Sequence, residues 1–210
     1  MPETTMTTKP YSPACERNQG PILDQLRVYF AGCRNALEIG SGTGQHAVHF
    51  AAGMPWLQWQ CSDHVDYLPG IRMWLDEAAL PNTPTPFALQ AVLKPQPGIA
   101  PLPSYRYDAV FSANTLHIMG WAEVRVLFIG LATVLADDAV LVIYGPFNDN
   151  GIFTSDSNRD FDASLKERDP RSGIRDFVAV NALAENIALR LTADIAMPAN
   201  NRLLVWRRGS

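Results

Sequence analysis

Three glycines at alternate positions mark a turn that brings the backbone close to a ligand. Gly40, Gly42 and Gly44 follow the apolar run 36–39 and precede an amphipathic stretch that starts near Gln45. An apolar run ended by glycine is typical of a strand in a parallel sheet. The N–H groups at the start of the following helix, and the positive end of its dipole, favour an anionic ligand group. The pattern therefore predicts a strand, a glycine turn and a helix that together bind a small ligand.

The spacing of the glycines separates this turn from two common phosphate-binding motifs. In the dinucleotide fingerprint the third glycine comes five residues after the first, whereas Gly44 follows Gly40 by four, and no Gly-Lys-Ser/Thr of a P-loop is present. Glu38, two residues before Gly40, resembles the acid of motif I in class I S-adenosylmethionine (SAM) methyltransferases. In that family the acid organises the turn near the methionine amino group, and the glycines pass beneath the cofactor. The resemblance implies that residues of this turn bind SAM, namely Glu38, Gly40, Ser41, Gly42 and Gly44.

A second acidic residue stands where nucleotide-binding folds bind ribose. Asp63 lies 63 − 40 = 23 residues beyond Gly40 and follows the predicted strand 57–61. A carboxylate about 20 residues after the first glycine accepts hydrogen bonds from ribose hydroxyls in such folds. The alternative is a helix N-cap, which aspartate also favours, and the two roles are compatible. We therefore expect Asp63 to bind the cofactor.

Strand and helix patterns alternate through the first two thirds of the chain. The predicted strands are 36–39, 57–61, 87–93, 107–113, 139–144, 189–196 and 203–206, and the predicted helices are 22–30, 45–52, 67–79, 124–135, 154–168 and 176–187. This alternation predicts a doubly wound, Rossmann-like α/β sheet. Right-handed crossovers bring the carboxyl ends of parallel strands to one edge, so Glu38, Asp63, Asn114 and Gly145 should meet there.

Asn114 and His117 follow the fourth predicted strand, three residues apart. On a helical turn they share a face, and the reference pKa of histidine suits a general base. The hypothesis is that Asn114 orients the methyl acceptor and also contacts the cofactor, while His117 accepts the acceptor's proton or a hydrogen bond. The alternatives are a core histidine bonded to backbone and an asparagine that serves only the turn.

Further polar residues are candidates for substrate binding. Residues 11–18 are rich in polar side chains and precede a predicted helix, and one hypothesis is that they form a lid over the cofactor. The alternative is that they are a solvent-exposed helix start. The candidates that orient the substrate are Arg17, Asn18, Tyr144 and Asn148.

Length, charge and cysteine content limit the classes of protein to which this chain can belong. The 210 residues predict a single domain, 11–210, after a flexible tail, 1–10. A formal net charge of −4 argues against nucleic acid as a partner, and no apolar run is long enough to span a membrane. Three scattered cysteines and the polar start predict a reducing cytoplasm.

No metal is expected, because His46 and His49 lack an evident third ligand. The expected partner is a small-molecule substrate, and the expected state is a monomer or a homodimer.

Motifs along nearly the whole chain together resemble the methyltransferase-like protein 26 family, a domain-of-unknown-function family of class I methyltransferase-like proteins. The motifs are Ser12-Pro13-Ala14 with Arg17-Asn18, the turn at 37–46, Asn114-Thr115-Leu116-His117-Ile118, Gly145-Pro146-Phe147, Phe161-Asp162-Ala163-Ser164-Leu165, Gly173-Ile174-Arg175-Asp176 and Met197-Pro198-Ala199-Asn200-Asn201. The resemblance implies a seven-stranded, mostly parallel sheet with an antiparallel last strand, and SAM over the turn at 40–44. It supplies no substrate.

One position departs from that family. Its third strand usually ends in an aspartate near the adenine, whereas this chain has Leu89-Gln90-Ala91-Val92. Gln90 or Ala91 takes the place of the acid, and the amide of Gln90 offers the adenine amino group a neutral, weaker acceptor. We expect both residues at the cofactor site, with reduced adenine affinity.

The sequence thus favours a SAM-dependent methyltransferase that acts on a small molecule. Two alternatives stay open. The first is a non-catalytic SAM- or nucleotide-binding protein on the same fold. The second is an NAD-dependent oxidoreductase, which the glycine spacing and the acid before the turn disfavour.

Overall fold

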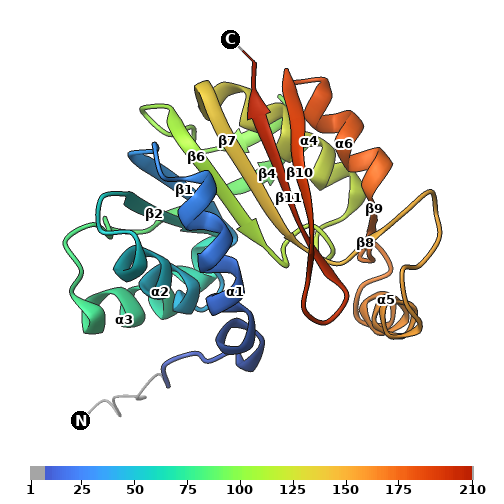
Figure 1. The fold of residues 1–210 in the computed structure, drawn as a ribbon, viewed down its shortest axis with the longest axis horizontal. Coiled ribbons are helices and arrows are strands. Elements are labelled where there is room, and N and C mark those ends of the chain that lie inside the picture. The colour runs from blue at the N-terminus through green and yellow to red at the C-terminus, as the bar shows by residue number, and fades with distance from the viewer. Residues whose placement is uncertain (1–7, 210) are drawn as a thin grey trace.

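The computed structural model describes residues 8–209, which build a seven-stranded mixed sheet (Figure 1). The strands of this sheet are β1 (Asn35–Ile39), β2 (Gln58–Asp63), β3 (Phe87–Ala88), β6 (Tyr107–Ala113), β7 (Leu135–Gly145), β10 (Leu189–Met197) and β11 (Asn201–Arg208). Their order is β10-β11-β7-β6-β1-β2-β3. Only β11 runs antiparallel to its neighbours. The predicted doubly wound, Rossmann-like sheet with an antiparallel last strand is confirmed.

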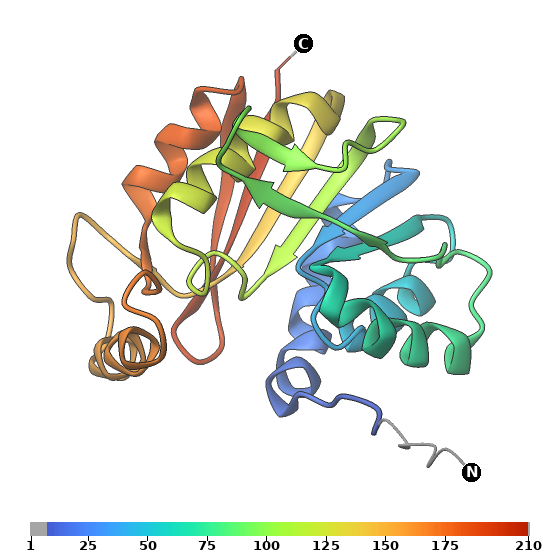
Figure 2. The ribbon, with the colours of Figure 1, turned by 180° about the vertical axis from the view of Figure 1, so that it is seen from behind.

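Helices cover both faces of the sheet (Figures 1 and 2). One face carries α1 (Pro13–Tyr29), α2 (Gln45–Gly53) and α3 (Leu68–Ala78), and the other carries α4 (Trp121–Val134) and α6 (Phe177–Glu185). On the first face the Phe50 ring lies 5.4 Å from those of Trp59 and Phe111. Because both faces are buried, the central strands are continuously apolar, as Val140 to Ile143 illustrate.

The parallel strands β1, β2, β6 and β7 all end at one edge of the sheet. The glycine turn, the short 3-10 helix η1 (Val65–Tyr67) and the loop 114–120 follow β1, β2 and β6 there. After β7, the chain forms β8 (Phe147–Asn148) and then α5 (Asp156–Arg168), which lies beyond this edge (Figure 1). This edge therefore collects the loops that the sequence motifs occupy.

Helix α1 begins nine residues before the predicted start, at Pro13 instead of Ile22 (22 − 13 = 9). The side chain of Ser12 accepts a hydrogen bond from Cys15 N and caps the helix, and Pro13 fits its first turn. Pro21 then lies inside the helix, where proline removes a backbone hydrogen bond at a cost of about 3 kcal/mol. Burial of Asn18, Ile22 and Leu26 on one face offsets that cost.

The predicted third strand, 87–93, is divided between two sheets. β3 pairs with β2, whereas β4 (Gln90–Val92) turns away and pairs with β5 (Gly98–Ala100) in an antiparallel hairpin. The hairpin crosses α4 at Gly130, where an added Cβ would lie 2.8 Å from Ile99 N. The prediction of one strand over 87–93 was therefore wrong, because burial of Leu89 and Ile99 decides the path of the chain.

The predicted tail is described only from residue 8, and residues 1–7 lie outside the described residues. Lys9 Nζ lies 3.6 Å from the centre of the Trp74 ring and 2.6 Å from Glu77 Oε2. Trp74 Nε1 donates a hydrogen bond to Pro10 O at 2.7 Å. The segment that leads into α1 therefore lies against α3.

Candidate functional site

The glycine turn has the backbone conformation that its composition predicts. Gly40, Gly42 and Gly44 have φ angles of +73°, +59° and +90°, a backbone region that residues other than glycine rarely adopt. The N–H groups of Gly40 and Ser41 both donate to Ser62 O, at 3.0 and 3.1 Å. The turn is thus tied to the end of β2, and it leads directly into α2.

Asp63 binds this turn from β2. Its Oδ2 accepts a hydrogen bond from Gly42 N and its Oδ1 one from His64 N, both at 2.7 Å. Burial raises the pKa of its carboxyl above the ordinary value, while these two hydrogen bonds oppose the shift. A carboxylate has about four acceptor positions, so Asp63 keeps capacity for ligand hydroxyls.

A cavity of about 290 Å³ opens beside the turn. Its lining unites Gly40, Asp63, Gln90 and Ala91, which come from three separate stretches of the chain. The remaining lining residues are Ile39, His64, Tyr67, Leu89, Ile99, Thr115, Ile118, Met119, Glu123 and Leu127. The walls are therefore mainly apolar, and Asp63 and Glu123 are the carboxylates among them.

Glu38 is buried in the core and does not line this cavity. Its side chain is buried, and its Oε2 accepts a hydrogen bond from Trp59 Nε1 at 3.1 Å. Desolvation raises the pKa of Glu38 to about 7, against hydrogen bonds from Trp59 and Ser41 that lower it. Ser41 is buried as well, and its Oγ accepts from Ser62 N at 3.3 Å.

Asn114 and His117 lie in the loop after β6, and both side chains approach Gly145, where an added Cβ would lie 3.7 Å from Asn114 Oδ1 and 3.9 Å from His117 Nδ1. Asn114 has a φ of +56°, and its N–H donates to Tyr144 O at 2.9 Å. His117 is buried, and its ring meets that of Phe161 edge-on at 5.2 Å. Its pKa is lowered to about 4 by burial and by Arg175 and Arg168. His117 is therefore neutral at pH 7, and it lies outside the cavity lining, on the side of the loop that faces α5.

Three of the four substrate candidates lie close together, because Asn18, Asn201 and the charge of Arg17 all oppose the burial that raises the pKa of Tyr144. Arg17 is exposed on α1, whereas Asn18 is buried and its Oδ1 lies 2.7 Å from His46 Nε2. Tyr144 is buried at the end of β7. Asn148 Oδ1 is buried and makes no hydrogen bond within residues 8–209. Asn18 is thus engaged with α2.

A family model described as "protein of unknown function (DUF938)" matches residues 9–208, nearly the whole chain. The chain belongs to the DUF938 family. The prediction that the chain belongs to a domain-of-unknown-function family is thereby confirmed.

Solved structures share the fold of this DUF938 chain at low identity. An O-methyltransferase family protein from Burkholderia thailandensis is 17% identical, with a TM-score of 0.76 over 94% of this chain and 58% of that one. Mitomycin 7-O-methyltransferase MmcR is 18% identical, with a TM-score of 0.76 over 93% of this chain and 54% of that one. Human N-acetylserotonin methyltransferase, solved in complex with SAM, is 12% identical, with a TM-score of 0.73 over 94% of this chain and 53% of that one. The DUF938 chain therefore has a methyltransferase-like Rossmann fold and spans little more than half the length of these proteins.

Several lining residues of the DUF938 cavity were not predicted. Tyr67 lies in η1, Ile99 in the hairpin, and Thr115, Ile118 and Met119 in the loop after β6. Thr115 and Ile118 belong to a quoted motif, but their apolar or hydroxyl side chains carried no chemical signal of their own. Gln45 was noted only as a helix start, although its buried side chain bonds Ser12.

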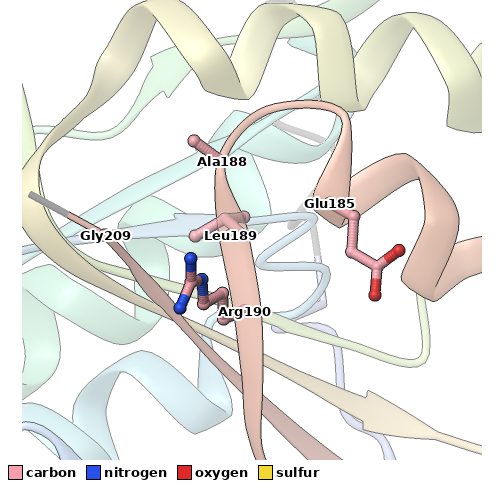
Figure 3. Close-up of a pocket in the computed structure, with 5 residues that line it drawn as sticks. All are labelled: Glu185, Ala188, Leu189, Arg190 and Gly209. Atoms are coloured by element: carbon pink, nitrogen blue, oxygen red, sulfur yellow. The ribbon is translucent and has the colours of Figure 1, made fainter.

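A larger hollow of about 550 Å³ lies elsewhere in the DUF938 structure (Figure 3). Glu185, Ala188, Leu189, Arg190 and Gly209 line it, where β10 begins and β11 ends. The carboxylate of Glu185 and the guanidinium of Arg190 point away from each other (Figure 3). Because no sequence motif reaches it, we assign the candidate site to the cavity beside the glycine turn.

The described residues form neither a metal cluster nor a membrane-spanning helix. Across residues 8–209, His, Cys, Asp and Glu side chains do not gather in threes in a way that suits a metal ion. No helix in the same range has both the length and the apolarity to cross a membrane.

Proposed function

We propose that this protein is a SAM-dependent methyltransferase that acts on a small-molecule acceptor. The observation that carries the proposal is the convergence of Gly40, Asp63, Gln90 and Ala91 on one cavity. The sequence predicts all four as cofactor-binding residues, and they come from three separate stretches. The fold that the chain shares with SAM-dependent methyltransferases supports the same reading, as do the motifs that resemble methyltransferase-like protein 26.

The residues present fit the adenosine part of SAM. A flat base suits the apolar walls that Leu89, Ile99 and Leu127 provide, and ribose hydroxyls suit the carboxylate of Asp63. The Cβ direction of Gly42 meets no atom within 4 Å, so the turn leaves open space above it. The volume of about 290 Å³ takes part of such a ligand, and the rest would extend over the glycine turn.

When bound, SAM supplies an electrophilic methyl group on a sulfonium. The chain's own task is then to hold the acceptor in line and to exclude water. We assign the acceptor to the side of the loop that carries Asn114 and His117. The pKa of about 4 makes the neutral ring of His117 a weak base at pH 7, so it suits a hydrogen bond to the acceptor better than a role as general base. The roles of Arg17, Asn18, Tyr144 and Asn148 in substrate binding, and a monomeric or homodimeric state, stay predictions.

The test is calorimetric binding of SAM and of S-adenosylhomocysteine to the wild type and to Asp63→Ala. We expect the substitution to weaken binding by about 1–3 kcal/mol, because it leaves buried polar partners unpaired. Asp108→Ala is a matched control, since Asp108 also accepts two backbone hydrogen bonds, from Arg34 N and Asn35 N at 2.8 Å, at the start of β1. Equal affinity of Asp63→Ala and the wild type would remove Asp63 from the site.

Two further experiments separate the alternatives, a product assay with labelled SAM and a binding measurement with NAD. SAM binding without methylated product in a metabolite mixture incubated with labelled SAM would favour a non-catalytic binding protein. Binding of NAD in place of SAM would favour an oxidoreductase.

A further inference from the structure

Four consecutive carbonyl groups of the loop after β6 are bound by one distant segment of the chain. Arg175 Nε donates to Leu116 O at 3.0 Å and Gly173 N to His117 O at 2.9 Å. Ser172 Oγ donates to Ile118 O at 3.0 Å, and Arg175 Nη2 donates to Met119 O. The loop 116–119 is neither helix nor strand, so residues 172–175 supply donors that regular structure would otherwise provide.

The guanidinium of Arg175 joins the two ends of this loop. Its Nε serves Leu116 O while its Nη2 serves Met119 O and, at 3.0 Å, Arg171 O. A planar guanidinium presents five donors in a fixed arrangement. One side chain therefore sets the distance between both ends of the loop.

Residues 172–175 are themselves held by α5 and by β8. The buried carboxylate of Asp162 accepts from Ile174 N at 2.7 Å and pairs with Lys166 Nζ at 2.6 Å. An added Cβ at Gly173, whose φ is +151°, would lie 2.9 Å from Asp162 Oδ1, so this approach requires glycine. Arg175 and Asp176 form β9 (Arg175–Asp176), which pairs with β8 in parallel. The segment is thus a fixed support.

The opposite side of the same loop lines the candidate cofactor cavity. Thr115, Ile118 and Met119 all belong to that lining, and Thr115 also packs against Gly40. Neither Arg175 nor Ser172 lines the cavity. Any effect of residues 172–175 on a ligand there must pass through the loop backbone.

We propose that residues 172–175 position the loop 114–119 for cofactor binding, with Arg175 as the positioning residue. The inference rests on the proposed function for the identity of the cofactor. Its structural half, that Arg175 fixes the loop backbone, stands on the hydrogen bonds alone. It gives a role to a motif, Gly173-Ile174-Arg175-Asp176, that the proposed function leaves unused.

The experiment compares Arg175→Ala, Arg175→Lys and Arg208→Ala with the wild type. Arg208 is the matched control, because its Nη1 also donates to carbonyl groups, those of Ala132 at 3.4 Å and Leu135 at 2.6 Å, away from the cavity. The measurements are the dissociation constant of S-adenosylhomocysteine, the melting temperature, and hydrogen exchange of the amides at 115–119.

We expect Arg175→Ala to weaken S-adenosylhomocysteine binding about tenfold or more and to speed exchange at 115–119. Arg175→Lys should recover part of the affinity, because an ammonium group keeps the charge but lacks the fixed fork. Arg208→Ala should lower the melting temperature without either change. Wild-type affinity in Arg175→Ala, or an equal loss of affinity in Arg208→Ala, would overturn the proposal.

Two further outcomes keep the inference separate from the proposed function. If the wild type binds neither SAM nor S-adenosylhomocysteine, the proposed function fails, and so does the cofactor part of this inference. Exchange at 115–119 then decides the structural half, which unchanged exchange in Arg175→Ala would overturn. If Arg175→Ala does not fold, Arg175→Lys and Ser172→Ala carry the same comparison.

Discussion

The glycines of the turn share a backbone conformation but not a packing environment. An added Cβ at Gly40 would lie 2.9 Å from Thr115 Cγ2, and one at Gly44 would lie 3.1 Å from Ile71 Cα and 3.3 Å from Trp74 Cβ. Gly42 has no atom within 4 Å of that position. Gly40 and Gly44 therefore let the β6 loop and α3 approach the turn, whereas Gly42 serves the backbone conformation alone.

This difference predicts unequal costs for two alanine substitutions. Gly42→Ala should destabilise the protein by about 1–2 kcal/mol, the strain of a left-handed non-glycine residue. Gly40→Ala should cost about 3 kcal/mol or more, because overpacking against Thr115 adds to the same strain. Denaturant unfolding of both variants measures the costs. Equal losses would show that Thr115 moves aside freely.

At the level of elements, Gln45 joins the start of α1 to the start of α2. Its Oε1 accepts from Ser12 N at 2.5 Å, and its Nε2 donates to Ser12 O at 3.4 Å. Thr43 Oγ1 also donates to the same Oε1, at 3.1 Å. The buried amide therefore binds both backbone groups of the α1 N-cap and holds it at the glycine turn.

We expect Gln45→Ala to loosen the start of α1. Loss of the two hydrogen bonds to Ser12, worth about 1 kcal/mol each, should speed hydrogen exchange of the amides at 15–18 by roughly thirtyfold. Gln60→Ala is the control, since Gln60 is also buried and donates to Thr85 O and Cys61 O, at 2.9 and 3.1 Å, away from α1. Unchanged exchange at 15–18 in Gln45→Ala would show that Asn18 and the helix interior hold this end without it.

The sequence predicts elements best where a local pattern and the tertiary environment agree. The turn at 40–44 was predictable because glycine alone tolerates its φ angles, and the sheet because both its faces are buried. The start of α1 was not predictable, because proline usually ends a helix. The free-energy cost of Pro21 inside α1 is offset only by burial of the helix against α2. The β4–β5 hairpin depends on Gly130 of α4, far along the chain.

The residues of the candidate site also differ in whether a local sequence pattern predicts them. Gly40, Asp63, Gln90 and Ala91 carried a signal because spacing or family pattern marked them. Thr115, Ile118 and Met119 line the cavity from a loop whose carbonyl groups at 116–119 are bound by residues 172–175, and such long-range hydrogen bonds leave no local pattern. His117 lay within a predicted motif, yet its burial against Phe161 depends on where α5 packs.

At the scale of the whole molecule, buried titratable groups make stability depend on pH in two opposite ways. Burial lowers the pKa of both His46 and His117 to about 4. The stability that each contributes is present above its unfolded pKa of about 6.5 and is lost as pH falls through about 4. Burial raises the pKa of Glu38 instead, so its contribution has the reverse sign.

Substitution of Glu38 by glutamine isolates that reverse contribution, because the histidines are common to both proteins. The folded protein favours the neutral form of Glu38. The contribution of Glu38 to the stability of the protein is therefore present below pH 4.5 and is lost as pH rises through about 7. Glu38→Gln keeps an acceptor for Trp59 Nε1 and carries no charge to bury.

The free energy of unfolding of Glu38→Gln should therefore rise relative to the wild type between pH 4.5 and pH 8, by about 3 kcal/mol at roughly 1.4 kcal/mol per pKa unit. Urea unfolding at several pH values measures the difference, with Glu167→Gln, at an exposed position of α5, as the control. A difference that stays constant across this range would mean that Glu38 titrates alike in the folded and unfolded chain. The acid before the glycine turn would then be ionised in the fold at neutral pH, despite its burial beneath Trp59.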